Sequence, residues 1–356
     1  MGKATKGGGS RRKPGGGAPE DQPHEERMRN WEGRVGPGGA VRADLYLAEA
    51  GPLSRSQLKA RSAELRVDGR PAKLSRPLKE GELLELSWIE EESLSIEAED
   101  IPLSILYQDE RLMIVDKAQG MVTHPGAGNR HGTLANASLY IARREREAER
   151  EAERPKARPP AARAGIVHRL DKDTSGLIVV AKDAEAQAFL ASQFKDRLAR
   201  KEYLAITRGQ PMPPSGRIAD RLGRDPRDRK RFARVAEGGK TAVTDYRTLS
   251  SWGGYALVSL RPKTGRTHQL RVHMAALGCP ILGDPVYGKR DPSFPEATLM
   301  LHAYRLKISL PDQGLHSVFV APLPVRFKEV LLALAAVFGK GRLLAPPRSG
   351  QPDNAP

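Results

Sequence analysis

The block that most constrains this chain is residues 165–180, where two strongly apolar runs flank a short polar loop. The runs are Ile166-Val167 and Leu177 to Val180, and the loop between them reads His-Arg-Leu-Asp-Lys-Asp-Thr-Ser-Gly. Short apolar runs bounded by turn residues are typical of buried strands, and polar loops on a rigid sheet often carry catalytic groups. The block therefore predicts a sheet with a functional loop. By its residues alone, the loop is a metal loop, a charge-pair turn or a carboxylate nucleophile site.

Length and composition exclude several classes of protein. The 356 residues suggest two domains, at roughly 150 residues each. A single cysteine, Cys279, excludes a disulfide scaffold and a zinc site built from several cysteines. The longest apolar run, residues 330–338, is shorter than the roughly 20 residues of a membrane-spanning helix, and no apolar core follows the basic N-terminus. We therefore expect a cytoplasmic protein with no membrane segment.

The charge of the chain points to a polyanionic partner. The formal net charge is +16, and residues 195–240 alone carry 14 Lys or Arg against 6 Asp or Glu. This stretch therefore holds a net charge of +8, half of the excess of the whole chain. Basic residues clustered in one region favour a nucleic-acid track over a composition that is merely basic throughout.

Low-complexity segments divide the chain. Residues 1–39, rich in Gly, Pro, Arg and Lys, are expected to form a disordered basic tail, and residues 341–356 a loose tail. The acidic residues 89–100 are interpreted as a linker. Residues 143–164 combine alternating Arg and Glu with a Pro-rich stretch, which favours a solvated helix or disorder and indicates a surface insertion without catalytic duty. Ordered domains are then expected at 41–88 and 101–340.

Residues 41–88 have the signals of a small α/β module. Ser54 is a good N-cap for a short helix through Arg61, Asp68-Gly69 between extended runs predicts a hairpin, and Glu80-Gly81 predicts a turn before a last strand. The pattern from Leu45 to Leu86 resembles the S4 RNA-binding domain. That resemblance implies an RNA-facing surface lined by Arg55, Ser56, Lys59, Arg61 and Arg66.

A second block with chemical potential is residues 261–273, Arg-Pro-Lys-Thr-Gly-Arg-Thr-His-Gln-Leu-Arg-Val-His. After the glycine, polar and apolar residues alternate, which predicts a strand from Thr267 to His273. In that strand Arg271 would share a face with Gln269 and His273. A buried arginine needs a carboxylate partner, and Asp171 is a candidate.

Four ordered motifs together resemble the RluA/RluD-type pseudouridine synthases. The His-Arg-Leu-Asp-Lys-Asp-Thr-Ser-Gly-Leu block is similar to the family's signature. The further matching blocks are residues 105–134, Arg200-Lys201-Glu202-Tyr203-Leu204-Ala205, and residues 264–288 followed by Leu301-His302-Ala303. The resemblance covers about residues 41–325 and implies an α+β fold, with a mixed, mostly antiparallel sheet and flanking helices behind the small S4-like module.

The resemblance implies that the chain isomerises uridine to pseudouridine in RNA. In this reading Asp171 is the catalytic carboxylate, which attacks C1′ or takes the C2′ proton, and Arg271 pairs with it. Tyr203 would stack on the extruded uracil, Arg169 would fill the vacated space or hold a phosphate, and Arg266 would position RNA. The family needs no metal and no organic cofactor. An S4 module before this catalytic domain resembles the subgroup that modifies large-subunit (23S) ribosomal RNA, and we expect a monomer.

Other readings of individual residues lead elsewhere. Ser175 is expected to hydrogen-bond within the loop, because no spacing identifies a base that would activate it. His124, His268 and His273 are not expected to bind a metal, since the predicted strand puts the last two on opposite faces. The competing functions are a non-catalytic RNA-binding ribosome-assembly factor and a base-removing glycosidase, which would typically need a second carboxylate.

Overall fold

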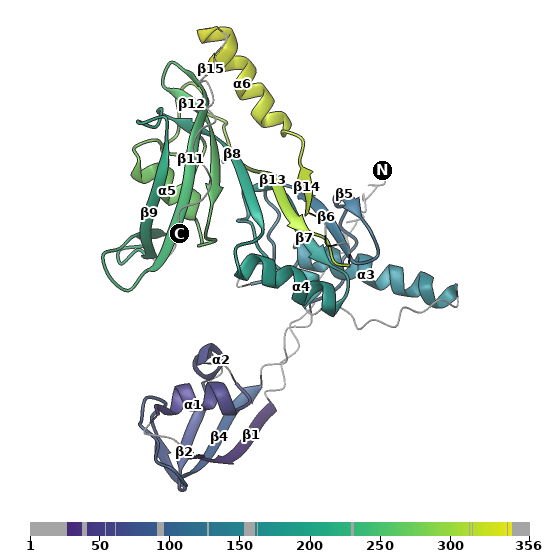
Figure 1. Cartoon of the computed structure of the whole chain (residues 1–356), viewed down its shortest axis with the longest axis vertical. Helices are drawn as coiled ribbons and strands as arrows, with labels where there is room; N and C mark the ends of the chain where they lie inside the picture. Colours follow the sequence, from purple (N-terminus) through teal and green to yellow (C-terminus); the bar gives the residue numbers. More distant parts are fainter. Residues whose placement is uncertain are drawn as a thin grey trace, which may run out of the picture. The chain divides into compact units, whose positions relative to one another are not determined.

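The computed structural model divides the chain into two units, residues 1–95 and 96–356. It describes residues 27–37, 41–53, 55–60, 62–90, 96–126, 128–152, 161, 163–228, 231–312, 314, 316–339 and 341–343 (Figure 1). Of the predicted tails at residues 1–39 and 341–356, residues 1–26, 38–39 and 344–356 lie outside the described residues, as does Ser54. The expectation of a loose C-terminal tail is wrong for Arg342–Leu343, which form a short strand paired with residues 250–251.

The N-terminal unit is a four-stranded sheet with two helices. Its elements are β1 (Arg27–Arg34), α1 (Ala43–Ala50), α2 (Arg55–Ala60), β2 (Glu64–Val67), β3 (Arg70–Ala72) and β4 (Leu83–Glu90), and the strand order is β1-β4-β2-β3. Leu47 and Leu58 of the helices pack with Leu84 and Leu86 of β4 in one buried core. The S4-like identity of this unit stays a prediction.

The hairpin between β2 and β3 follows the sequence signal. Asp68 and Gly69 both adopt positive φ angles, 49° and 75°, as a two-residue hairpin turn with the right-handed strand twist requires. An oxygen of the Asp68 carboxylate also accepts a hydrogen bond from the Leu83 amide at 3.0 Å. The acidic side chain therefore ties the hairpin to the start of β4.

The expectation that residues 1–39 form one disordered tail is wrong for residues 27–34. These residues form β1, which pairs with β4 along its whole length, from Arg27 opposite Glu90 to Arg34 opposite Leu83. Trp31 packs against the core of the unit, and its ring lies over Gly33, where a Cβ atom would be only 2.5 Å away. This strand has few apolar residues, and its partners in β4 lie 49 to 63 positions away, so local composition could not reveal it.

The second unit is built on a large mixed sheet. Its strands are β5 (Ser104–Gln108), β6 (Leu112–Lys117), β7 (Ser175–Ala181), β8 (Arg200–Arg208), β9 (Ser215–Arg224), β10 (Phe232–Arg234), β11 (Lys240–Trp252), β12 (Tyr255–Pro262), β13 (Leu301–Ser309), β14 (His316–Val320) and β15 (Arg342–Leu343). The order is β10-β9-β11-β12-β8-β13-β7-β6-β5, with β14 on β13 and β15 on β11. Among the described strands, β13 and β7 alone pair in parallel, which confirms the mixed, mostly antiparallel sheet.

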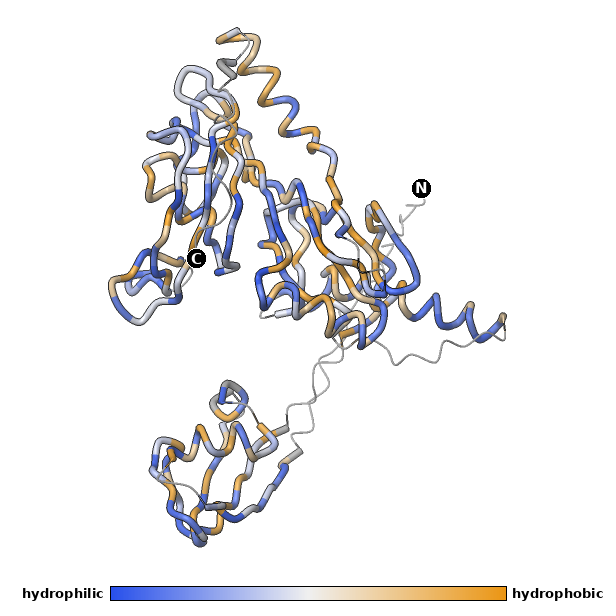
Figure 2. The backbone as a smooth tube through the Cα atoms, viewed as in Figure 1, coloured by the Kyte–Doolittle hydropathy of each residue, from blue (hydrophilic) through white to orange (hydrophobic). Residues whose placement is uncertain are grey.

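Helices flank this sheet, as predicted. They are α3 (Leu134–Glu151), the short 3-10 turn η1 (Arg163–Gly165), α4 (Ala184–Lys195), α5 (Gln269–Ala276) and α6 (Val325–Phe338). No helix in the described part of the chain is long and apolar enough to cross a membrane. Figure 2 shows α6 as mostly hydrophobic and the outer part of α3 as mostly hydrophilic.

The first part of the predicted insertion at 143–164, residues 143–151, belongs to helix α3. Thr133 caps its N-terminus, and its first turns are buried, whereas residues 143–151 form an exposed extension of the same helix. Lys182 pairs with Glu145 at 2.6 Å and fixes this extension against the body. Residues 153–160 lie outside the described residues.

The central strand β7 is buried on both faces. Ile178 and Val180 belong to the core that contains Tyr203, and Leu177 and Val179 belong to a second core on the other face. At the start of β7, Gly176 lies opposite Ala303 of β13, and Ala303 in turn lies opposite Tyr203 of β8. This row of the sheet brings the end of the polar loop 168–174 next to Tyr203.

Gly176 is required by this row, which gives a first prediction. Its φ angle is 110°, and an added Cβ atom would lie 2.3 Å from the Ala303 carbonyl oxygen. Gly254 is a matched control, because its φ is 102° but nothing lies within 4 Å of its Cβ position. We expect Gly254→Ala to lower the free energy of unfolding by about 1–2 kcal/mol, from backbone strain alone. Gly176→Ala should lower it by about 3–5 kcal/mol, since overpacking is added to that strain. Denaturant unfolding of both variants checks this, and equal losses would contradict it.

Candidate active site

The polar loop 168–174 is held from behind by the segment that follows β6. The hydroxyl of Thr123 donates to the Leu170 carbonyl oxygen at 2.9 Å, and the Gln119 amide donates to the Asp173 carbonyl at 3.0 Å. Within the loop, the Thr174 amide donates to the Asp171 carbonyl at 3.1 Å. Backbone carbonyls on both sides of Asp171 are thereby fixed, and its side chain projects from a rigid turn.

Lys117 is the most buried charged group behind this loop. Its side chain is fully buried, and Nζ donates to the carbonyl oxygens of Ala118 at 2.9 Å, Met121 at 2.8 Å and Lys172 at 3.2 Å. Burial lowers the pKa of Lys117 to about 8, against the opposing attraction of the Asp173 and Asp171 carboxylates. A three-donor ammonium thus links the end of β6 to the loop.

The strand predicted at residues 267–273 is wrong, because Gln269–Ala276 form helix α5. The Gln269 side chain starts the helix: its oxygen accepts from the Arg266 amide and the Thr264 hydroxyl, and its nitrogen donates to the Val243 carbonyl and the Thr244 hydroxyl. Seven alternating residues were too few to distinguish a strand from a short helix anchored by side-chain hydrogen bonds.

The helix separates the residues that the strand would have grouped. Gln269 and His273, four positions apart, both reach Thr244 on β11. Arg271 lies on another side of α5, where its side chain is 4% exposed. The argument that a strand would keep His268 and His273 apart therefore fails, although no three His, Cys, Asp or Glu side chains gather as metal ligands in the described part of the chain.

Arg271 lies between two carboxylates. Its Nε and Nη2 donate to Asp284 at 2.8 and 2.7 Å, and its Nη1 lies 3.6 Å from Asp171 Oδ2. The Asp284 side chain is fully buried, and its pKa is lowered, despite the opposing effect of burial, by Arg271 and by the amides of Val286 and Tyr287. Asp284 therefore neutralises the guanidinium, and the more exposed Asp171 takes the remaining face.

Sequence reasoning brought Arg271 to Asp171 but missed Asp284 as the stronger partner. A signal was present: Gly283-Asp284 directly follows an apolar run, and Gly283 has a φ of 72° in close approach to the Thr298 carbonyl. Such a turn aims the next side chain inward. Tyr287, whose ring lies 5.2 Å from the Arg271 guanidinium carbon, completes the surroundings and was also missed.

His268 completes the wall beside Asp171. Its Nε2 lies 4.0 Å from Asp171 Oδ2, and its Nδ1 lies 2.9 Å from the Tyr287 hydroxyl oxygen. The backbone of His268 is left-handed, with φ 55° and ψ 13°, directly before α5. Burial is the largest cause that lowers the pKa of His268, and Arg271 and Arg169 act in the same direction while Asp171 and Asp284 oppose them.

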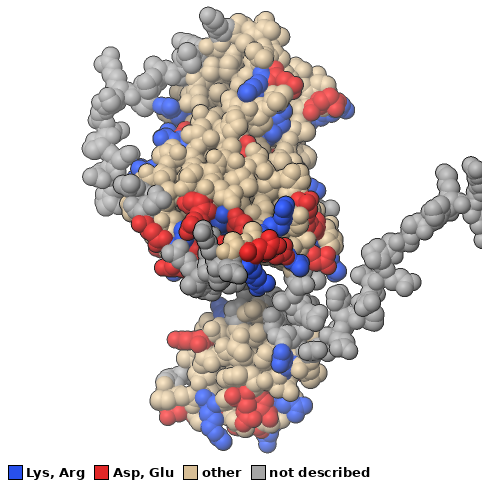
Figure 3. Space-filling model, turned by 90° about the vertical axis from the view of Figure 1, so that its right-hand side faces the viewer, with Lys and Arg blue, Asp and Glu red and all other residues tan. Residues whose placement is uncertain are grey.

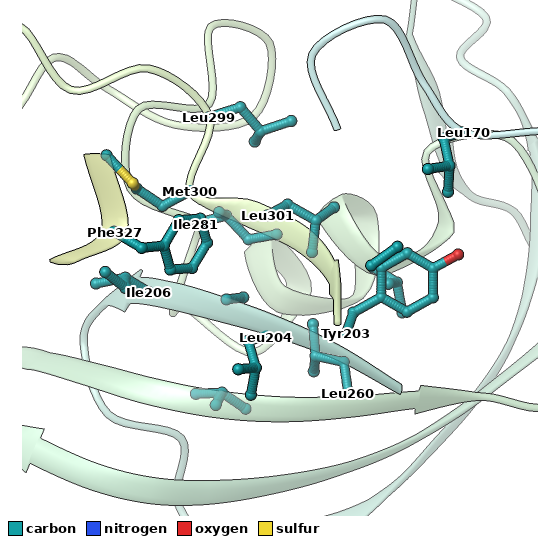
Figure 4. Close-up of a cluster of buried hydrophobic side chains, with 14 of the residues drawn as sticks. Leu170, Tyr203, Leu204, Ile206, Leu260, Ile281, Leu299, Met300, Leu301 and Phe327 are labelled. Carbon is teal, nitrogen blue, oxygen red and sulfur yellow. The ribbon is translucent and has the colours of Figure 1, made fainter. Parts of the chain in front are cut away.

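Tyr203 lies on β8 at the edge of the main hydrophobic cluster. Figure 4 shows its ring beside this cluster, with the hydroxyl pointing away from Leu260 and Leu301. The side chain is 9% exposed. Burial, and then the negative charge of Asp171, raise the pKa of the Tyr203 hydroxyl well above its usual value. The phenol therefore stays protonated at neutral pH.

The remaining predicted residues lie in varied surroundings. Arg169 is exposed on the loop, and Arg266 donates from Nε to the Thr241 carbonyl at 3.0 Å. In the N-terminal unit Arg66 is exposed and Arg55 pairs with Asp44 at 2.8 Å. The side chains of Ser56 and Lys59, and all of Arg61, lie outside the described residues.

Ser175 does not bond within its loop as expected. Its hydroxyl lies 2.9 Å from His302 Nδ1 on β13 and accepts from Arg326 of α6 at 2.6 Å. Burial lowers the pKa of His302 to about 4, so the imidazole is neutral at pH 7. The serine thus ties the start of β7 to neighbouring elements, and the expected internal bond is replaced by these contacts.

The basic stretch 195–240 forms the end of α4 and the strands β8, β9 and β10. Several of its arginines are already paired, such as Arg217 with Asp245 at 2.6 Å and Arg234 with Asp220 at 2.9 Å. Others, including Arg227, are exposed. Figure 3 views the molecule from the side of α3 and β14, where acidic and basic side chains are intermixed.

Taken together, the site offers a half-buried carboxylate with a fixed cation, a neutral phenol and an imidazole around it. A carboxylate of this kind can act as a nucleophile or as a base, and the fixed guanidinium 3.6 Å away orients it. The site is open to solvent at Asp171, whose side chain is 20% exposed.

Comparisons with known proteins agree with this arrangement. The family model described as RNA pseudouridylate synthase matches residues 111–276. The ribosomal large subunit pseudouridine synthase D of Borreliella burgdorferi is 40% identical over 297 residues, which cover 81% of this chain and 88% of that protein. The protein of the same name from Nitrosomonas europaea is 40% identical over 305 residues, which cover 83% and 84%.

A solved structure leads to the same class. Human RNA Pseudouridylate Synthase Domain Containing 1 superposes with a TM-score of 0.52 at 26% identity, covering 71% of this chain and 93% of that one. The chain belongs to the RNA pseudouridine synthase family, and it is an isomerase that converts uridine to pseudouridine in RNA. The resemblance to RluD-type pseudouridine synthases is thereby confirmed for the catalytic unit.

The pair between Arg271 and Asp284 gives a second prediction. Asp284→Asn leaves a buried guanidinium without its main counter-charge, so the free energy of unfolding should fall by about 3–5 kcal/mol at pH 7. Because the pKa of Asp284 is lowered in the fold, this stability is present above the carboxyl's unfolded pKa and lost as the pH falls through the folded value. The variant should therefore lose less stability than wild type on acidification.

The matched control is Asp245→Asn, which breaks a similar two-bond pair with Arg217 on the surface. An exposed pair of this kind contributes about 0–1 kcal/mol. Urea unfolding at pH 7 and at acidic pH values below 3.8, the ordinary pKa of the carboxyl group, measures both effects. If Asp284→Asn and Asp245→Asn lowered the free energy of unfolding equally, the burial of Arg271 would not make Asp284 more important than a surface partner.

Proposed function

We propose that this enzyme isomerises specific uridines of large-subunit ribosomal RNA, with Asp171 as the catalytic carboxylate. The observation that carries the catalytic assignment is the position of Asp171, a partly exposed carboxylate on a braced loop, 3.6 Å from a guanidinium that is itself held by Asp284. The relatives from Borreliella burgdorferi and Nitrosomonas europaea are named for the large ribosomal subunit, which supports the choice of substrate.

The proposed reaction needs one carboxylate and adds no atoms to the nucleotide, because it is an isomerisation. Asp171 attacks C1′ of the target nucleotide or removes the C2′ proton, and in either route the bond between N1 and C1′ breaks. The uracil then turns and C5 bonds to C1′, while the bond between Asp171 and C1′ breaks in the first route or C2′ takes its proton back in the second. Loss of the C5 proton restores the conjugated ring, and N1 takes up a proton, so the product is an isomer of the substrate. The Arg271 guanidinium, whose Nη1 lies 3.6 Å from Asp171 Oδ2, orients the carboxylate through this sequence.

Two further residues are assigned to handling the base. The target uridine must leave its stack to reach Asp171. The ring of Tyr203 lies at the edge of the main hydrophobic cluster and offers a surface for the extruded uracil, and its protonated hydroxyl is a donor for a base oxygen or a moving proton. Arg169, exposed two positions before Asp171, is suited to hold a phosphate or fill the vacated space.

RNA binding is proposed to extend over the basic stretch and the N-terminal unit. Arg266 would help to position the RNA strand near the polar loop 168–174. The N-terminal unit would bind RNA as an S4-like module through the surface that carries Arg55 and Arg66, together with Ser56, Lys59 and Arg61. We further propose that the enzyme acts as a monomer in the cytoplasm.

A third prediction tests the catalytic assignment. Large-subunit ribosomal RNA transcribed with uridine tritiated at C5 should release tritium when wild-type enzyme acts, because C5 loses its hydrogen in pseudouridine. Asp171→Asn keeps the size of the side chain but removes the carboxylate that acts as nucleophile or base, so release should fall by at least about 10⁴-fold, the order seen when an essential catalytic group is removed.

Three outcomes would count against this function. Release by wild type that Asp171→Asn leaves intact would remove Asp171 from the chemistry. RNA binding without any release by wild type would favour a non-catalytic assembly factor or another RNA. Loss of the base from the RNA, rather than its retention as pseudouridine, would indicate a glycosidase.

A fourth prediction tests the N-terminal surface. Replacing Arg55 and Arg66 together with alanine should weaken binding to the same transcript. It should also reduce the slope of log affinity against log salt by about one for each lost phosphate contact. The control replaces Arg143 and Arg150, exposed on the outer part of α3, and removes the same charge elsewhere. If the slope changed equally in both double variants, the effect would come from net charge and not from RNA contacts of the N-terminal surface.

A further inference from the structure

A chain of hydrogen bonds connects the backbone of β10 to the wall beside Asp171. The Phe232 amide donates to the Tyr287 hydroxyl oxygen at 2.9 Å, and that oxygen lies 2.9 Å from His268 Nδ1. On its other side the His268 ring presents Nε2 to Asp171 Oδ2 at 4.0 Å. The proposed nucleophile therefore lies at the end of a path that begins outside the site.

The path determines which nitrogen of His268 carries hydrogen. A phenol oxygen has one hydrogen to donate and accepts well in the plane of its ring. Since the Phe232 amide occupies the accepting position of Tyr287, the hydroxyl hydrogen is directed to Nδ1. Nδ1 then accepts, and in the neutral imidazole the hydrogen resides on Nε2, which faces Asp171.

The surroundings keep this imidazole neutral and in one orientation. Asp171 and Arg169 of the loop, Arg271 of α5 and Asp284 are the charged groups that act on it. The ring is held edge-on between two aromatic rings, with centroids 5.8 Å from Phe232 and 5.6 Å from Tyr287. Its side chain is 18% exposed. A neutral donor with a fixed tautomer is suited to orient a carboxylate, since it adds no charge that would suppress the nucleophile.

We propose that His268 is a positioning residue for the reaction, whose Nε2–H holds Asp171 Oδ2 in the attacking orientation while Tyr287, anchored on β10, sets its tautomer. This inference rests on the proposed role of Asp171. The distance of 4.0 Å exceeds a hydrogen bond, and contacts of this kind often tighten only when substrate is bound. Two anchors would then hold Asp171, Arg271 on one side and His268 on the other.

The left-handed backbone of His268 offers a sharp test. Asparagine adopts φ near 55° more readily than glutamine does, but its amide is too short to replace Nε2. Glutamine is less suited to this backbone, but its amide nitrogen can occupy the position of Nε2. If His268 has only a structural role, His268→Asn should react faster than His268→Gln. If His268 positions Asp171, His268→Gln should react faster.

The experiment measures single-turnover tritium release from the C5-labelled large-subunit transcript, with melting temperature and RNA affinity measured alongside. We expect His268→Asn to melt higher than His268→Gln and yet to react about 100-fold more slowly than wild type, the loss typical of a misplaced catalytic group. His268→Gln should stay within about 10-fold of wild type. RNA affinity should be unchanged in both.

Tyr287→Phe provides an independent arm, because it removes the hydroxyl from the path but keeps the ring over Arg271. Tritium release by Tyr287→Phe should fall at least about 10-fold, because the tautomer of His268 is then no longer fixed. Equal rates in the two His268 variants, a faster His268→Asn, or wild-type release by Tyr287→Phe would overturn the proposal. Failure of the proposed function is seen separately, as release that persists in Asp171→Asn or is absent from wild type.

Discussion

A guanidinium removed from water must be neutralised by groups in contact with it, and the arrangement of this active site follows from that requirement at Arg271. Asp284 supplies the neutralising charge with two short hydrogen bonds and is itself held by two backbone amides. Because Asp284 accepts hydrogen bonds from two of the three nitrogens of the guanidinium, Asp171 Oδ2 lies 3.6 Å from the third and stays partly exposed. A carboxylate with a near but incomplete partner remains available to a substrate.

Local sequence signals predicted the elements whose causes are local. The Asp68-Gly69 hairpin and the turn at Glu80-Gly81 before β4 both depend on residues within a few positions of one another. The polar loop between apolar runs was also correctly located. For the same reason, the motif that carries Asp171 could be recognised without any structure.

The errors occurred where distant partners determine the structure. Helix α5 begins because Gln269 reaches Val243 and Thr244 on β11, which the pattern of residues 267–273 does not reveal. Strand β1 exists because β4 pairs with it, despite a composition typical of a tail. Asp284 was missed as a partner of Arg271 for a similar reason, since thirteen positions and a turn separate the two residues.

The parallel pairing of β7 with β13 has a consequence for synthesis of the protein. Ser175 and His302 are 127 positions apart, and their hydrogen bond joins the end of the active loop to a strand made late on the ribosome. Contacts of such long separation form slowly, because a large loop must close first. A nascent chain that ends before β13 lacks this neighbour of β7. We therefore expect a newly made molecule to acquire its activity only after almost the whole catalytic unit has left the ribosome. The N-terminal unit, whose described strand pairings lie within residues 27–90, has its partners much earlier.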